Sequence, residues 1–207
     1  MKVAIIAAGG KSGQAVVREL LDRGHSVIAG VHHVLPFAPH ERLMVTTLDA
    51  TVPNSIAGLI GSCDAVISVI GHVKGSPATV QTDATRALIA ACRAVGVTRV
   101  ISLTGSGVRQ PGDRITFMDR FLNAGIGVVD PARIKDGLEA AALLASSGMD
   151  YTIIRVLKLT SRPKHDYKLT PNGPVQTFTS RATVAAAMCD VLERRSSVRS
   201  MPLVSNG

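Results

Sequence analysis

Short apolar runs alternate with amphipathic segments along most of the chain. The apolar runs predict buried strands at residues 3–7, 25–31, 43–50, 63–71, 98–105 and 150–160. Helical spacing of apolar positions predicts helices at 12–23, 52–62, 80–96, 113–148 with an interruption at 123–131, and 181–195. Regular alternation of strand and helix favours an α/β fold, a doubly wound parallel sheet with helices on both faces.

The segment after the sixth predicted strand has a different character. Residues 167–178 combine proline, glycine and asparagine with short polar stretches, which predicts a turn between two short strands. A proline-broken loop is predicted at 34–41. At 207 residues the chain is long enough for one sizeable core and short for two, so we expect a single domain over 1–207 with a small C-terminal elaboration.

The loop "AAGGKSGQ" joins the first predicted strand to the first helix, where backbone N–H groups can bind phosphate. A triphosphate loop needs a glycine five residues before Gly10, but that position is Ile5, inside the apolar strand. A dinucleotide fingerprint with three-residue spacing needs glycine at 7, 10 and 13, and only the first is replaced, by Ala7. The sequence therefore favours a dinucleotide, with residues 1–112 as the dinucleotide-binding half and 113–207 as the substrate-side half.

The end of the second predicted strand bears on which dinucleotide binds. NAD sites usually carry an acid there, which binds the ribose diol and would repel a 2′-phosphate, whereas this strand ends in His32 and His33. Lys11 and His32 can supply charge or a hydrogen bond to that phosphate, which favours NADP, with NAD as the alternative. Asp49 follows the third strand, where it can accept from the adenine amino group or cap the next turn.

The composition limits the classes of ligand and partner that we expect. Lys and Arg number 23 against 15 Asp and Glu, a net charge of +8 that suits an anionic ligand. The basic residues are scattered and only 3% of residues are aromatic, so we expect no nucleic-acid partner. No apolar run reaches bilayer-spanning length, and we expect a cytoplasmic protein without a membrane partner. Cys63, Cys92 and Cys189 lack metal-ligand spacing, which predicts reduced core cysteines and no metal.

Five segments follow one another in the order of a known family: "AAGGKSGQAVVRELLDRGHSVIAGVHH", "LDATVP", "CDAVISVIG", "RALIAACRAVGVTRVISLTGSG" and "SSGMDYTIIR". The chain resembles the atypical short-chain dehydrogenase/reductases of the NAD(P)H-binding, NmrA-like group. Within that group it is similar to the small one-domain branch of biliverdin-IXβ reductase/flavin reductase and bacterial NADH-flavin reductases. The resemblance implies a Rossmann fold that binds NADP. The cofactor-binding positions that it implies, together with their neighbours at the strand ends, are Ala8, Gly10, Lys11, Ser12, Gly13, His32, Asp49, Ala50, Ile70, Gly71, Leu103 and Thr104.

The chain departs from the family pattern in four places. Ala7 replaces the first loop glycine, His32 replaces a common arginine, and Val156 replaces the proline of "YTIIRP". The serine that follows the fifth strand in the reductase branch falls on Gly105. A hydroxyl near the substrate must then come from a neighbouring residue.

The usual catalytic pair of short-chain dehydrogenases is absent. These enzymes use Tyr-x-x-x-Lys, but Tyr151 is followed at that spacing by Arg155, and Tyr167 by Pro171. Carbonyl reduction by that mechanism is therefore not expected. Hydride transfer to a flavin, quinone or tetrapyrrole needs mainly alignment, because such an acceptor can take its proton from water.

Three side chains are candidates for a catalytic role. Thr104 and His72 lie near the expected nicotinamide end, although a loop histidine is often only solvent-exposed. Lys135 precedes Glu139 by four residues, as a lysine does in related subfamilies, but its spacing to "SSGM" differs from theirs by about two residues. The alternative for Lys135 is a surface pair with Glu139.

Two function classes follow from these observations. The first is an NADPH-dependent reductase of a small planar acceptor, and the second is a non-catalytic NADP-binding redox sensor of the NmrA-like type that acts on a protein partner. Arg109 and Arg181 can bind an anionic substrate or lie on the surface. The apolar residues of the 113–131 insertion can cover the site or form an interface, in a monomer or a homodimer.

Overall fold

The computed structural model describes residues 1–33 and 37–207, so residues 34–36 of the predicted loop lie outside the described residues. The strands of its main sheet are β1 (Lys2–Ile6), β2 (Ser26–Val31), β3 (Leu43–Thr47), β4 (Ala65–Ser68), β5 (Arg99–Gly105), β6 (Asp150–Val156), β8 (Tyr167–Thr170) and β10 (Leu203–Asn206). Their order is β3-β2-β1-β4-β5-β6-β10-β8, and β8 alone runs antiparallel to its neighbour. This order confirms the doubly wound, Rossmann-like sheet.

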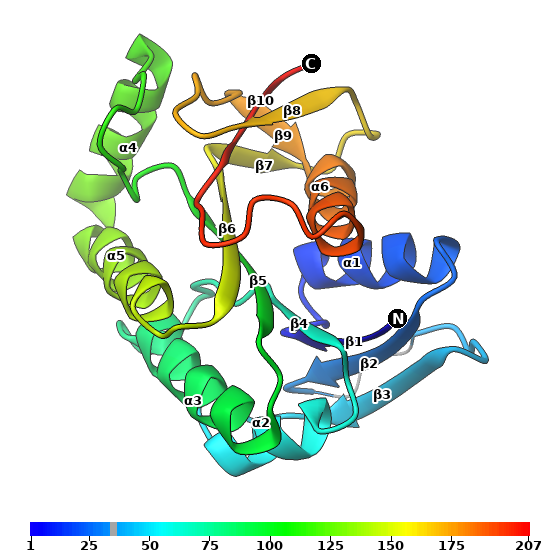
Figure 1. The fold of residues 1–207 in the computed structure, drawn as a ribbon. Helices are drawn as coiled ribbons and strands as arrows, with labels where there is room; N and C mark the ends of the chain where they lie inside the picture. Colours follow the sequence, from blue (N-terminus) through cyan, green and yellow to red (C-terminus); the bar gives the residue numbers. More distant parts are fainter. Residues whose placement is uncertain (34–36) are drawn as a thin grey trace.

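Helices cover both faces of this sheet (Figure 1). On one face α1 (Lys11–Asp22) packs beside α6 (Arg181–Glu193). The other face carries α2 (Pro53–Ile60), α3 (Val80–Val95) and α5 (Pro131–Ala145). The remaining helix, α4 (Phe117–Val129), packs against α5 beyond the end of β5. Each predicted helix is therefore present.

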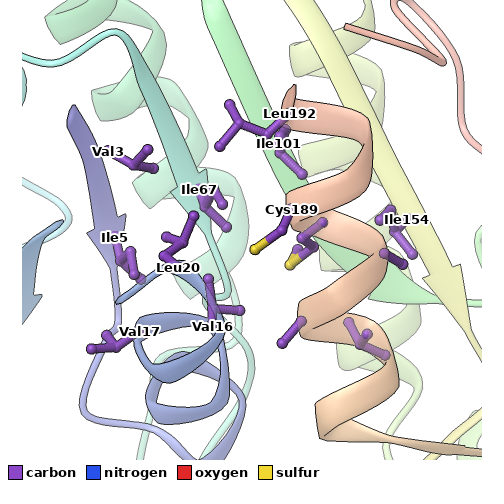
Figure 2. Packing of buried hydrophobic residues seen from close by; sticks show 14 of the residues in the cluster. Val3, Ile5, Val16, Val17, Leu20, Ile67, Ile101, Ile154, Cys189 and Leu192 are labelled. Atoms are coloured by element: carbon purple, nitrogen blue, oxygen red, sulfur yellow. The ribbon is translucent and has the colours of Figure 1, made fainter. Parts of the chain in front are cut away.

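Both faces of the central strands are buried, which explains their continuous apolar runs. Along β1, Val3 and Ile5 belong to the core under α1 and α6, whereas Ala4 and Ile6 belong to the core under α2, α3 and α5. Figure 2 shows the first of these cores, where side chains of α1 and α6 meet β1, β4, β5 and β6. The three cysteines are buried and free, as expected.

The C-terminal part differs from the local pattern. The two short polar strands exist, but they do not pair with each other: β8 pairs with β10, and β9 (Phe178–Ser180) pairs in parallel with β7 (Lys158–Thr160) in a second, two-stranded sheet. The strand β10 is absent from the sequence prediction because four residues near a chain end give little periodic signal. Helix α4 also continues through the predicted interruption, and the chain breaks at Asp130, whose side chain accepts from the backbone N of Arg133 at 3.2 Å and caps α5.

Candidate functional site

The carboxyl ends of β1 to β6 meet at one edge of the sheet, and the strand order reverses between β1 and β4. In open α/β sheets this switch point forms the ligand-binding crevice. The parallel register places the loops after β1, β2, β3, β4 and β5 along this edge. The topology thus gathers the predicted cofactor positions: Ala8, Gly10, Lys11, Ser12 and Gly13 after β1, His32 after β2, Asp49 and Ala50 after β3, Ile70 and Gly71 after β4, and Leu103 and Thr104 at the end of β5.

The start of α1 presses directly against the end of β1. A Cβ on Gly13 would lie 2.4 Å from the carbonyl oxygen of Ala7 and 2.6 Å from the Cα of Ala8, closer than real Cβ atoms approach. Gly10 is the N-cap of α1, and the exposed Lys11 is the first residue of the helix. Because the N–H groups of the first helical turn have no partner within the helix, this narrow cradle fits a pyrophosphate.

Ala7, at the first glycine position of the predicted fingerprint, adopts the left-handed conformation that favours glycine. Its φ is +64°, in a region that L-residues rarely occupy. The backbone N of Ala8 donates to the carbonyl of Gly30 at 2.9 Å, and that of Gly10 to the carbonyl of Ala7 at 3.2 Å. These bonds hold the turn in place. Ala7 therefore keeps the conformation of the phosphate loop, at the cost of a backbone conformation that is unfavourable for alanine.

Replacement of Ala7 by glycine is therefore expected to stabilise the protein. Relief of the left-handed strain outweighs the added chain entropy of glycine by up to about 1 kcal/mol. Chemical denaturation would measure this change. The matched control is Ala8→Gly: Ala8 is fully buried, so loss of its methyl group should lower the free energy of unfolding by about 1 kcal/mol. If Ala7→Gly is less stable than the native protein, the backbone of Ala7 is not strained.

The edge where the ribose is predicted to bind carries two exposed histidines. The Nδ1 of His32 lies 3.0 Å from the Nε2 of His33. Asp49 accepts through Oδ1 from the backbone N of Thr51 at 2.9 Å and from its hydroxyl at 2.7 Å. These bonds, helped by nearby His32, lower the pKa of Asp49. The turn-capping role of Asp49 is confirmed, and its contact with adenine stays a prediction.

At the predicted nicotinamide end, β5 presents the half-buried Thr104 to α5. A Cβ on Gly137 would lie 3.4 Å from the Thr104 hydroxyl oxygen. A cavity of about 20 Å³, room for about one water molecule, opens beside this contact between β4, β5, α3 and α5. Its polar lining residues are Ser68, Gln81, Thr85, Ser102 and Thr104.

Lys135 lies away from Thr104. The α5 residue that faces Thr104 is Gly137, two residues further along the helix. The side chain of Lys135 is 79% exposed, and its Nζ lies 3.8 Å from a carboxylate oxygen of Glu139. The surface pair is thus confirmed, and Lys135 is not brought to Thr104.

His72 has a partner that the sequence did not reveal. Its Nε2 lies 2.8 Å from Oδ2 of Asp136, which is buried and also accepts from the backbone N of Gln81 at 2.8 Å and of Thr82 at 2.9 Å. Burial alone would raise the pKa of Asp136, but the hydrogen bonds from Thr82, Gln81 and His72 outweigh it, and this pKa is lowered. Asp136 on α5 therefore caps α3 across the interface and holds His72 at the rim of the site.

The loop after β5 is fixed by a second buried carboxylate. Asp119 accepts from the hydroxyl of Ser106 at 2.8 Å and from the amide of Asn123 at 2.6 Å, and it forms an ion pair with Arg109. The hydroxyl of Ser106 and the charge of Arg109 are thus engaged within the protein. Thr104 remains the hydroxyl at the end of β5 that lines the cavity.

Tyr167 and Arg155 are both engaged within the protein. The hydroxyl of Tyr167 donates to Asp190 at 2.6 Å, and burial together with this carboxylate raises its pKa. Arg155, at the spacing where the pair would have lysine, is fully buried and bound to Asp113. Its guanidinium also donates to the carbonyls of Val108 and Pro171, each at 3.0 Å.

The insertion exposes apolar side chains at the start of α4. Phe117 is 82% exposed and Phe121 63%, with their rings stacked at a centroid distance of 6.4 Å. Whether they cover the site or form an interface stays a prediction.

None of the helices in the described part of the chain has the length and apolar character to cross a membrane. In residues 1–33 and 37–207, no three His, Cys, Asp or Glu side chains gather as possible metal ligands.

Comparisons with known proteins agree with this geometry. A family model described as NAD(P)H-binding matches residues 7–195. An uncharacterized chloroplastic protein of Arabidopsis thaliana, At2g34460, is 31% identical over 175 residues, which cover 78% of this chain and 60% of that protein. The chain thus spans less than two thirds of that relative.

Solved structures share the fold over the whole chain. The oxidoreductase ylbE from Lactococcus lactis superposes with a TM-score of 0.84 at 19% identity, covering 100% of this chain and 91% of that one. A short-chain dehydrogenase/reductase from Veillonella parvula in complex with NADP gives 0.83 at 20% identity, covering 99% and 94%. At these identities the likeness shows the fold. Together with the family match, it shows that the chain belongs to the NAD(P)H-binding family, as its resemblance to the NmrA-like group implied.

Proposed function

We propose that the protein is an NADPH-dependent reductase of a small planar acceptor such as a flavin or a quinone. The observation that carries the proposal is the close contact of Gly13 with the end of β1, at the same sheet edge as Thr104. Bound NADPH would supply a hydride at that edge. The chain would bind and orient the two reactants there, and its lack of a Tyr-x-x-x-Lys pair suits acceptors that take their proton from water.

The direct test is a titration with NADPH and NADH, followed by NADPH oxidation in the presence of FMN, menadione or biliverdin. Binding with acceptor-dependent oxidation, both lost in Gly10→Asp, would support a reductase. The added carboxylate would occupy the N-cap of α1, where phosphate is expected, and repel it. Binding without oxidation of any acceptor would favour the redox sensor, and absence of binding would contradict both functions.

The preference for NADP is proposed to rest on Lys11 and His32. Both are exposed, and β2 ends without an acid. We expect Lys11→Ala combined with His32→Ala to raise the Kd for NADPH about tenfold, as removal of charge-assisted contacts to a phosphate should, and to leave the Kd for NADH unchanged. Cofactor titration by fluorescence would measure both constants.

The control for this pair of substitutions is Lys135→Ala, which removes an exposed lysine from another part of the surface. It should change neither Kd. Equal weakening of NADPH and NADH in the Lys11 and His32 variant would show that these residues do not read the 2′-phosphate.

A further inference from the structure

A cluster of basic residues lies just beyond the carboxyl end of β6. Val156, the last residue of β6, pairs in register with Gly105, next to Thr104. The chain then enters β7 at Lys158, which pairs with Phe178 of β9. The second sheet therefore begins two residues past the end of β6, which lies beside the end of β5 that carries Thr104.

The ring of Phe178 is 46% exposed and lies close to two cations. The Nζ of Lys158 is 5.6 Å from the ring centroid, and the Cζ of Arg162 is 6.0 Å from it. Such contacts hold the two cationic groups near the same aromatic surface. In a chain with four phenylalanines and no tryptophan, this cluster offers both an apolar face and charge.

The charges of this cluster are not neutralised by the protein. Within residues 1–33 and 37–207, neither Lys158, Arg162 nor Arg181 forms an ion pair with a carboxylate. Arg181 instead donates to the hydroxyl of Ser161 at 3.2 Å. It is also the first residue of α6, where the helix dipole repels a cation. A bound anion would relieve this repulsion.

From this arrangement we infer that Lys158, Arg162 and Phe178 form a subsite for the anionic group of a planar acceptor. The two cations bind its phosphate or carboxylate, Phe178 contacts its apolar part, and Arg181 adds to the positive potential. The inference rests on the proposed reductase function and narrows its substrate class to acceptors with an anionic tail. A small ligand fits better than nucleic acid, since base stacking along a strand needs more than one exposed ring here.

FMN and riboflavin test the subsite because they share one ring system and differ by a phosphate. In the native protein we expect the KM for FMN to be about tenfold lower than that for riboflavin. Lys158→Ala with Arg162→Ala should raise the KM for FMN to that of riboflavin and leave riboflavin unaffected. Phe178→Ala should raise both constants. Arg86→Ala with Lys135→Ala, two exposed cations on α3 and α5, is the matched control and should change neither.

Direct binding separates failure of the subsite from failure of the reductase. If NADPH binds but none of FMN, riboflavin, menadione and biliverdin is reduced, the reductase is contradicted. Quenching of flavin fluorescence by the NADP-loaded protein then decides the subsite: tighter binding of FMN than riboflavin, lost in the Lys158 and Arg162 variant and weakened by salt, supports it. Equal KM and equal affinity for the two flavins in the native protein, or a preference for FMN that survives in the variant, would overturn it.

Discussion

Gly13→Ala is expected to abolish tight NADPH binding and to destabilise the fold. The new methyl would lie 2.4 Å from the carbonyl oxygen of Ala7 and 2.6 Å from the Cα and carbonyl oxygen of Ala8. These are backbone atoms, so α1 must move away from β1. We expect the free energy of unfolding to fall by about 3 kcal/mol and the Kd for NADPH to rise about 100-fold. Chemical denaturation and cofactor titration measure the two effects.

Two other glycines serve as controls for Gly13. A Cβ on Gly58, inside α2, meets no atom within 4 Å, so Gly58→Ala should preserve or increase stability. A Cβ on Gly10 would lie 3.5 Å from its nearest neighbour, so Gly10→Ala should fold normally and weaken NADPH binding alone. Unchanged stability in Gly13→Ala would mean that helix and strand are less closely packed than the structure has them.

The sheet and its phosphate loop could be predicted because both depend on local sequence signals. Apolar runs such as Val3 to Ile6 are continuous because both faces of the strand are covered, and the spacing of Gly10 and Gly13 marks the turn into α1. Ala7 shows the limit of such a pattern. The turn keeps its left-handed geometry through hydrogen bonds made by neighbours, so the missing glycine did not change the fold.

The partners of the polar residues could not be predicted, because they come from distant segments. Asp136 meets His72 only because α5 packs against the start of α3, and nothing near either residue signals the contact. The same holds for Arg155 and Asp113, which are 42 positions apart. For Lys135, the i, i+4 spacing to Glu139 predicts the surface pair. Only the packing of α5 on β5 showed that Gly137 faces Thr104.

These buried contacts also join the C-terminal half of the chain to the loop after β5. Arg155 lies in β6 beside Thr104 of β5, and its guanidinium binds the loop after β5, the turn after β8 and the segment before β10. Four parts of the chain thus meet at one cation. Asp113 is the carboxylate that compensates this buried charge.

Asp113→Asn is accordingly expected to destabilise the protein strongly. The side chain of Arg155 is fully buried and that of Asp113 only 4% exposed, so the substitution leaves a buried guanidinium without a counter-charge. Loss of one partner of such a pair costs about 4 kcal/mol. The matched control is Lys135→Ala, which breaks an exposed pair and should change the free energy of unfolding by less than about 0.5 kcal/mol.

The native protein and Asp113→Asn are expected to differ in their free energy of unfolding. The pH dependence of that difference identifies the charge of Asp113 as its cause. Burial opposes ionisation of Asp113, but the hydrogen bond and charge of Arg155 and the backbone N–H of Gln110 lower its pKa below the ordinary value. A lowered pKa in the folded state stabilises the protein above the unfolded value, about 3.9, and that stabilisation is lost as the pH falls through the folded value. Denaturation of the native protein and Asp113→Asn should therefore differ most near neutral pH and converge in acid. A difference that is constant with pH, or below about 1 kcal/mol at neutral pH, would show that the ion pair does not hold these segments together.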